Sequence, residues 1–198
     1  LCTNSRGIYP TIYSILREQR PQAETGCIAE WDGIKFLVDS AAISYVDVAG
    51  NYEKDSTQLC RMAEKYIKEK KPVFFAVCFD QIDHVGHAIG HDTPAYYDVV
   101  ASIDIQVGRI IQAAKDAGIY DDTVFIITAD HGGIERRHGG HSLLEMEIPY
   151  ILFGKGIKRG MEITDTVIQY DTAATIAEIL GLKRPQCWRG LPTYCVFK

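Results

Sequence analysis

The chain has 198 residues, a hydrophobic fraction of 46% and a formal net charge of -5. Such a length supports one domain, spanning residues 1–198, with a single sizeable core. The negative charge argues against binding of a nucleic-acid polymer along its phosphate backbone. No apolar run approaches the roughly 18 residues of a membrane-spanning helix, and no signal peptide is visible. A periplasmic or other extracytoplasmic location would therefore require a signal peptide upstream of Leu1.

The N-terminal part of the chain alternates predicted helices and short strands. Apolar residues at helical spacing predict a helix over residues 10–17, and short strands are predicted over residues 26–31 and 43–48. Asp55, with Gln58 three residues further on, matches a capping box that would open a second helix. The apolar stripe of that helix comprises Leu59, Met62, Ala63, Tyr66 and Ile67.

Two apolar strands flank one long helix in the central part of the chain. Residues 73–79 and 124–127 are continuous apolar runs, typical of strands buried on both faces. Thr93 and Pro94 are expected to open the intervening helix and Gly118 to close it. A strand–helix–strand crossover makes the two strands parallel. The polar loops that follow them should therefore emerge at the same edge of the sheet.

The last third of the chain continues the alternation. A loop over residues 134–141 precedes a predicted strand over residues 148–153, and a helix is expected from Asp171 to Gly181. The tail is irregular, with a short final strand predicted over residues 194–197. Alternating helices and strands predict an α/β protein, a three-layer α/β/α sandwich with a mostly parallel central sheet.

Acidic residues and histidines gather in the loops that follow the two central strands. Asp83 and His87 lie four residues apart after the first strand, Asp130 and His131 are adjacent after the second, and His138 follows in the next loop. Two carboxylates and three imidazoles exceed the four ligands of one tetrahedral zinc ion. They suit two divalent metal ions about 4 Å apart, with zinc as the expected metal.

Each of these residues also has an ordinary structural interpretation. A single histidine is more often a surface or core residue than a ligand, and Asp130 followed by His131 and two glycines could simply form a polar turn. Arg136 and Arg137 could bind an anionic substrate or belong to a solvated turn. The prediction of a metal site rests on several such residues at one edge of the sheet rather than on any one of them.

Three motifs in order resemble those of a known enzyme superfamily. Residues 83–87 (DHVGH) resemble the DxxGH motif of the alkaline phosphatase superfamily, and residues 128–132 (TADHG) resemble the (T/S)xDHG motif of its type I phosphodiesterase/nucleotide pyrophosphatase branch. The segment from His138 through Glu145 to Pro149 resembles the HGGxS/T…E…P pattern. The resemblance covers most of the chain from Pro10 onward.

The resemblance implies an alkaline-phosphatase-like α/β/α sandwich with two zinc or other divalent ions. By this likeness Asp83, His87 and His138 would hold one ion, and Asp130 with His131 the other. His138 is preferred over His141 because the first histidine of the HGG pattern is the family's ligand. His84 occupies a variable position of DxxGH and is expected to be exposed or outside the set of ligands.

The chain also departs from the family pattern. The family uses an Asp at the end of an N-terminal strand and a Thr or Ser nucleophile some tens of residues later, and no such strand precedes Pro10. Residues 2–6 (CTNSR) resemble the CxPSR motif of sulfatases only superficially, because Asn4 replaces its proline. We therefore expect the chain to be the C-terminal portion of a catalytic domain, lacking its N-terminal strand or strands, its nucleophile and one Asp ligand.

The implied function is a two-metal-dependent hydrolase of small phosphoric esters, of the phosphodiesterase or nucleotide pyrophosphatase type. In that class a Thr or Ser alkoxide attacks phosphorus in line and forms a covalent intermediate, so these 198 residues alone are expected to be inactive. The alternatives are a phosphomonoesterase or sulfatase of the same superfamily, or a metal-binding domain without catalysis, since fold alone does not select the chemistry.

Overall fold

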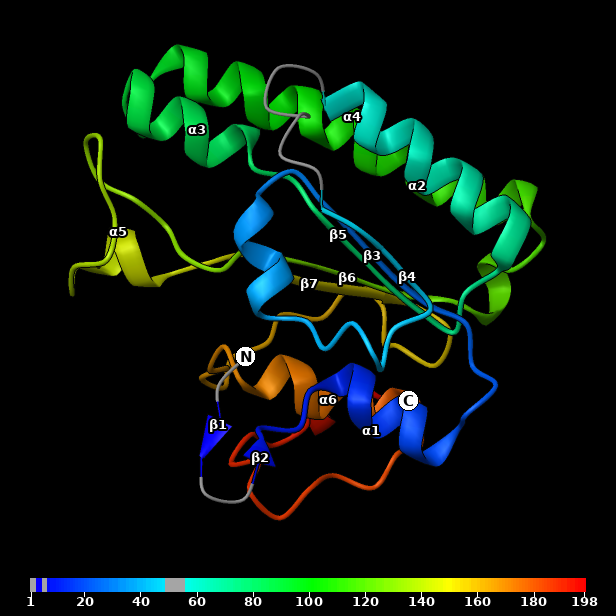
Figure 1. Cartoon of the computed structure of the whole chain (residues 1–198). Coiled ribbons are helices and arrows are strands. Elements are labelled where there is room, and N and C mark those ends of the chain that lie inside the picture. The colour runs from blue at the N-terminus through cyan, green and yellow to red at the C-terminus, as the bar shows by residue number, and fades with distance from the viewer. Residues whose placement is uncertain (1–2, 5–6, 49–55) are drawn as a thin grey trace.

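The computed structural model describes residues 3–4, 7–48 and 56–198, and these form helices on both sides of a layer of strands (Figure 1). Three helices lie on one side: α2 (Ser56–Lys70), α3 (Gln81–Ala88) and α4 (Pro94–Asp116). Two lie on the other: α1 (Ile12–Gln19) and α6 (Asp171–Ile179). The predicted three-layer α/β/α architecture is confirmed.

A parallel three-stranded sheet surrounds the fully buried strand β3 (Thr25–Ala29). Its order is β4 (Tyr45–Asp47), β3 (Thr25–Ala29) and β5 (Phe74–Cys78), and both neighbours run parallel to β3. All five residues of β3 are buried. Ile28 packs with Leu59 and Ala63 in one hydrophobic cluster, which fixes α2 against the sheet.

A second pair of strands lies apart from this sheet. Strand β6 (Val124–Thr128) pairs antiparallel with β7 (Tyr150–Gly154), and Ile126 is opposite Leu152. Within the described part of the chain, β5 and β6 each have a hydrogen-bonded neighbour on one side only. The strands predicted over residues 73–79 and 124–127 are confirmed, but they do not pair with each other.

A large cavity occupies the space between β5 and β6. Its volume is about 2720 Å³, and its wall includes every residue of β5 and β6. The helices α4 and α6 contribute further apolar lining, including Ile103, Ile110, Ile176 and Ile179. The expectation that both strands are buried on both faces was therefore wrong: all of β5 is only half-buried, and β6 is half-buried except for its exposed last residue.

The helices follow their sequence signals closely. Thr11 caps α1 through a reciprocal capping box with Ser14. Thr93 caps α4 by accepting a hydrogen bond from the backbone N–H of Tyr96, with Pro94 in the first turn. Gly118 follows α4 with φ +70°, a left-handed conformation that glycine adopts without strain. The predicted cap of α2, Asp55, lies outside the described residues. No helix in the described ranges is long and apolar enough to cross a membrane.

Two local expectations require correction. The polar stretch directly after β5, described from the sequence as a polar loop, forms helix α3. The final strand expected over residues 194–197 is a 3₁₀ helix, η3 (Tyr194–Val196), next to a single isolated bridge between Ile157 and Phe197. Residues with high β-propensity form a strand only where a neighbouring strand can pair with them, and the tail pairs through one isolated bridge only.

Candidate metal centre

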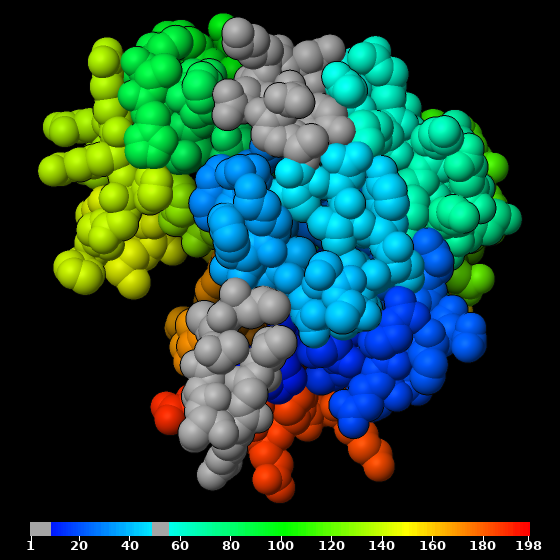
Figure 2. All heavy atoms as spheres, in the orientation of Figure 1, coloured from blue at the N-terminus to red at the C-terminus, as the bar shows by residue number. Residues whose placement is uncertain are grey.

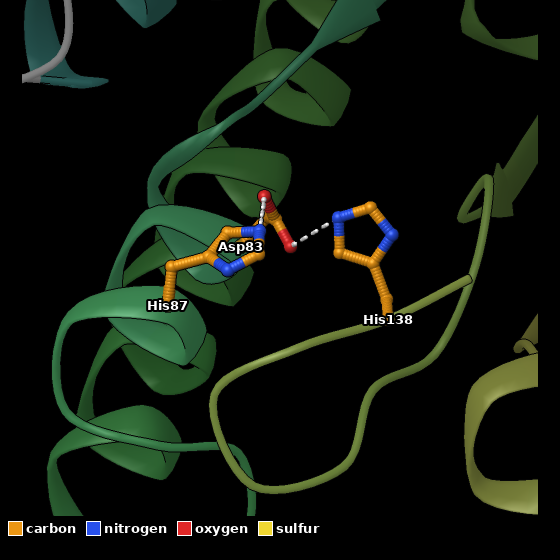
Figure 3. Close-up of side chains that lie close together, drawn as sticks. All are labelled: Asp83, His87 and His138. Atoms are coloured by element: carbon orange, nitrogen blue, oxygen red, sulfur yellow. Dashed lines mark ion pairs between the residues drawn. The ribbon is translucent and has the colours of Figure 1, made fainter. Parts of the chain in front are cut away.

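Asp83, His87 and His138 converge where α3 meets the loop after β6 (Figure 3). Their possible ligand atoms all lie within 4.8 Å of one another. His87 Nε2 is 3.3 Å from Asp83 Oδ2, because residues four apart share one face of a helix. His138 Nε2 approaches from the loop on the opposite side and lies 3.9 Å from Asp83 Oδ1.

Backbone carbonyl groups fix the orientation of two imidazoles. His87 Nδ1 lies 2.9 Å from the carbonyl oxygen of Arg136, and His131 Nδ1 lies 2.8 Å from that of Gly132. A carbonyl oxygen only accepts, so each Nδ1 carries the hydrogen and the neutral ring presents the lone pair of Nε2. Metal-binding histidines are commonly oriented in this way by a carbonyl or carboxylate partner.

Asp130 and His131 lie beside this cluster. His131 Nε2 is 3.5 Å from Asp130 Oδ2, and the Asp130 side chain is 83% exposed, so it is open to a ligand. The rings of His131 and His138 stack with their centroids 3.7 Å apart, which joins the two predicted ligand sets. The loops after β5 and β6 thus meet at one rim, as predicted, although a cavity separates the two strands.

The electrostatics of Asp83 favour a bound cation. Its Oδ1 atom is buried and has no hydrogen-bond partner among the described residues, although the side chain as a whole is 33% exposed. A buried carboxylate oxygen without a partner loses the solvation that water would provide. A carboxylate and two correctly oriented imidazoles are a donor set that suits zinc or a similar divalent ion. The residues present therefore fit the metal that the sequence implies.

Glu145 gives the loop after His138 its shape. Its carboxylate accepts hydrogen bonds from Gly140 N at 2.8 Å and Ser142 Oγ at 2.6 Å, and these donors hold the pKa of Glu145 below its ordinary value. Ser142 and Glu145 also form the capping box of α5 (Leu143–Met146). In Figure 2 this loop and α5, in yellow-green, stand beside α3 in green. Glu145, the acidic residue of the HGGxS/T…E…P pattern, therefore shapes this loop through its hydrogen bonds.

The remaining predicted residues lie outside the cluster. His141 and His84 are exposed and do not belong to the group of possible ligands in the described chain. Arg136 and Arg137 are also exposed, and Arg136 Nε donates a hydrogen bond to the carbonyl oxygen of Ile89. This contact ties the loop to the segment after α3, so Arg136 has at least one structural role.

Sequence reasoning did not single out Glu30, at the end of β3. Its side chain is fully buried, and its Oε2 accepts hydrogen bonds from the backbone N–H groups of Asp80 at 2.5 Å and Gln81 at 3.2 Å. These groups begin α3, the helix that carries Asp83 and His87. Burial raises the pKa of Glu30, and the surrounding donors offset only part of that effect. The only sequence feature that could have indicated a role for Glu30 was its position near the end of the strand predicted over residues 26–31.

Comparison with known proteins identifies the family. The model of the type I phosphodiesterase / nucleotide pyrophosphatase family matches residues 24–147, a range that includes α3, β6 and all five predicted ligands. The chain belongs to this family, within the alkaline phosphatase superfamily. Its relatives are enzymes, including hydrolases, so the chain is a member of an enzyme family.

Individual relatives extend this likeness across the superfamily. The chain is 25% identical to arylsulfatase K of Bos taurus over 146 residues, which are 71% of this chain and 23% of that protein. It is 27% identical to the 2,3-bisphosphoglycerate-independent phosphoglycerate mutase of Pseudomonas putida (strain GB-1) over 157 residues, 76% of this chain and 29% of that protein. The chain thus spans less than a third of the curated relatives it matches.

Solved structures share the fold. Ps i-CgsB is 17% identical and matches with a TM-score of 0.66 over 98% of this chain and 60% of its own. The phosphoglycerate mutase of Leishmania mexicana, also 17% identical, matches with a TM-score of 0.62 over 90% of this chain and 38% of its own. Both structures contain a larger share of polypeptide outside the matched region than this chain does.

Proposed function

We propose that this chain carries the metal-binding part of a divalent-metal-dependent hydrolase that acts on small phosphoric esters. The observation that carries the proposal is the convergence of Asp83, His87 and His138, in which the buried Asp83 Oδ1 has no hydrogen-bond partner among the described residues. Asp130 and His131 form the second ligand set, linked to the first by the stacked rings of His131 and His138. Bound divalent ions would polarise the phosphoryl group and stabilise the charge that develops there.

The protein's own residues would prepare this site before any substrate arrives. Helix α3 places Asp83 and His87 one turn apart on the same face. The carbonyl oxygens of Arg136 and Gly132 hold the Nδ1 hydrogens of His87 and His131, so each ring keeps Nε2 as its ligand atom. The rim is open to solvent at Asp130, which leaves an approach for an anionic ester.

Phosphodiesters and nucleotide pyrophosphates are the substrate class that the family match favours. Sulfate esters are the second candidate, because bovine arylsulfatase K is among the relatives. Both classes are tetrahedral anionic esters that metal ions can polarise, so the metal ligands alone do not discriminate between them.

Metal titration of the chain tests the proposal. In competition with a chromophoric chelator, the wild-type chain should bind one zinc ion tightly and a second one weakly. Asp83→Asn should remove the tight site, while His84→Asn, on the same helix but outside the cluster, should bind like wild type. Absence of metal binding by the folded wild-type chain would contradict the proposal, and so would tight binding that survives Asp83→Asn.

We further propose that residues 1–198 are the C-terminal portion of a catalytic domain, and that a β-strand from the rest of that domain fills the cavity between β5 and β6. Each of these strands has a free hydrogen-bonding edge in the described structure, and apolar side chains from β5, β6, α4 and α6 line the space. The cavity wall includes Lys71 and Asp122, which precede β5 and β6, and Asp83 and Asp130, which follow them, so the cavity extends along the full length of both strands. A strand seated there would end beside the metal ligands.

A comparison with the longer protein tests this second proposal. Backbone amides of β5 and β6 that exchange rapidly in the 198-residue chain should become protected when the remaining polypeptide is present, because a paired edge shields its N–H groups. The chain alone should not hydrolyse 4-nitrophenyl phosphate, its phenylphosphonate diester analogue or 4-nitrophenyl sulfate, and the longer protein should prefer the diester. Equal protection in both proteins would overturn the placement of the strand.

A further inference from the structure

The imidazole of His91 is wedged between two glycines of the metal-binding motifs. A Cβ atom built on Gly86, in α3, would lie 2.4 Å from His91 Nε2, and one built on Gly133, after β6, would lie 2.1 Å from the same atom. A Cβ atom essentially never lies within 3.0 Å of a heavy atom of another residue, so the ring fits in this position only because both residues are glycines. The space above Gly86 is occupied by the His91 ring.

Two hydrogen bonds fix His91 to one carbonyl group of the loop that carries His138. The backbone N–H of His91 donates to the carbonyl oxygen of Glu135 at 2.6 Å, and His91 Nδ1 lies 3.0 Å from the same oxygen. The carbonyl can only accept, so Nδ1 carries the hydrogen. Glu135 has φ +53°, a left-handed conformation that is unfavourable for a residue with a side chain and needs support from its surroundings.

His91 therefore contacts both elements that supply the metal ligands. Its ring touches α3 at Gly86, one residue before His87, and its hydrogen bonds hold Glu135, three residues before His138. The group of possible ligands in the described chain does not include His91, whose Nε2 faces the two glycines. The ring is thus positioned to set the distance between the ligands rather than to bind the ion.

We propose that His91 is a positioning residue, which sets the separation between α3 and the His138 loop so that Asp83, His87 and His138 can share one divalent ion. This inference rests on the proposed metal site. If the ring is removed, the two elements lose their common spacer, and the ligands must be ordered when the ion binds. Partner residues beyond the ligands typically change metal affinity by about 10–100-fold, and we expect His91→Ala to weaken zinc binding by roughly tenfold.

A conservative variant separates the hydrogen bond from the bulk of the ring. An Asn side chain can place its amide N–H near the position of Nδ1, so His91→Asn should retain part of the affinity that His91→Ala loses. His84→Ala removes an exposed imidazole from α3 and is the matched control, with wild-type affinity expected. Unfolding of each metal-free variant should be measured in parallel, because a purely structural role would lower stability without changing the affinity of the folded fraction.

A double-mutant cycle tests the wedge itself. Gly86→Ala in the wild-type chain should weaken zinc binding, because the new methyl group displaces the His91 ring. In the His91→Ala background the same change should have no harmful effect, since the space is empty and alanine favours a helix more than glycine does. The harmful effect of Gly86→Ala should disappear in the His91→Ala background only if the new methyl group and the His91 ring compete for the same space.

The outcomes are distinguishable. If the wild-type chain binds no divalent ion, the proposed metal site fails and this inference fails with it. If the wild-type chain binds zinc but His91→Ala binds equally well, the inference alone is overturned. Additive effects of Gly86→Ala and His91→Ala would also overturn it, because they would show that the two positions act independently.

Discussion

The burial of strands β3 and β6 is the reverse of what their hydrophobicity predicts. Strand β6 (VFIIT) is the more apolar of the two, yet four of its residues are only half-buried and the fifth is exposed, whereas all five residues of β3 (TGCIA) are buried. The difference lies in their neighbours: β3 has a partner on each side, while β6 has β7 on one side and the cavity on the other. Hydrophobicity predicts that a strand forms, but neighbours determine how deeply it is buried.

This contrast separates the molecule into a packed side and an open side. The packed side contains β3 with α2 and buries Ile28, Leu59 and Ala63 almost completely. The open side borders the cavity and ends in the rim with Asp83, Asp130 and His138. Substitutions on the packed side should therefore mainly affect stability, and substitutions at the rim should mainly affect metal binding and turnover.

The largest effect is expected at the rim. In the proposed longer enzyme, Asp83→Ala or Asp130→Ala should lower kcat/KM by about three orders of magnitude, because loss of a metal ligand removes several kcal/mol of transition-state stabilisation. Urea unfolding should stay cooperative, with a midpoint close to that of the wild type. A collapse of stability together with activity would show that the rim also holds the fold together and would break the proposed separation.

A matched pair of isoleucines measures the difference between the two sides directly. Ile28→Ala, in β3, should cost about 2–5 kcal/mol because it opens a new cavity in a closed core. Ile126→Ala, in β6, should cost only about 1 kcal/mol, because its side chain already lines open space and has less buried area to lose. Urea unfolding of the 198-residue chain measures the loss of stability in each variant. Equal losses would mean that the cavity is closed in solution.

The proposed longer protein allows the same two substitutions to be compared with the cavity filled. If a further strand fills the cavity, the cost of Ile126→Ala should rise toward that of Ile28→Ala in the longer protein, while the cost of Ile28→Ala stays the same. An unchanged cost at Ile126 would place the additional polypeptide elsewhere.

A smaller effect should distinguish the two histidines of the loop. His138 Nε2 lies 3.9 Å from Asp83 Oδ1, whereas His141 is exposed and outside the cluster. His138→Ala should weaken zinc binding by about 10–100-fold, and His141→Ala should change it by less than a factor of about two. Chelator competition on the folded chain measures both. Equal effects would show that the loop rearranges when the ion binds.

Much of the architecture was predictable because local signals and long-range packing agree. Apolar periodicity, Thr93 with Pro94, and Gly118 marked the long helix α4, and the crossover argument brought the loops after β5 and β6 to one rim. That argument could not tell whether β5 and β6 pair with each other, because a crossover constrains direction but not adjacency, and in the structure they do not pair. The cavity between β5 and β6 exists because no described strand lies between them. The apolar periodicity of a strand does not predict whether a neighbouring strand is present.

The candidate site shows the same limit. Spacing placed Asp83 and His87 on one face, and the motifs brought in Asp130, His131 and His138. Glu30 and His91 were assigned no role from the sequence, because their roles depend on contacts across 50 and 44 residues of sequence, respectively. The sequence shows Gly86 within one motif and Gly133 directly after another, but it does not show that the His91 ring packs against both of them.

The smallest expected effect concerns Glu30 and the dependence of stability on pH. Burial raises its pKa above the ordinary value of 4.5, so the folded chain holds the proton more tightly than the unfolded chain. Its contribution to stability is then fully present below about pH 4.5 and is lost as pH rises through the folded-state pKa. Glu30→Gln stays neutral and can still accept both N–H groups of α3 through its amide oxygen.

The free energy of unfolding of Glu30→Gln, relative to wild type, should therefore increase with pH above about 4.5 and then level off once Glu30 is ionised in the folded wild-type chain. Urea unfolding at half-unit pH steps measures this difference and cancels the titration of all other groups. Glu64→Gln, which removes a carboxylate paired with Arg109 on the packed side, controls for the loss of a negative charge elsewhere. A constant difference between Glu30→Gln and wild type across the pH range would show that folding does not raise the pKa of Glu30, because the folded and unfolded chains would then bind the same number of protons at this group.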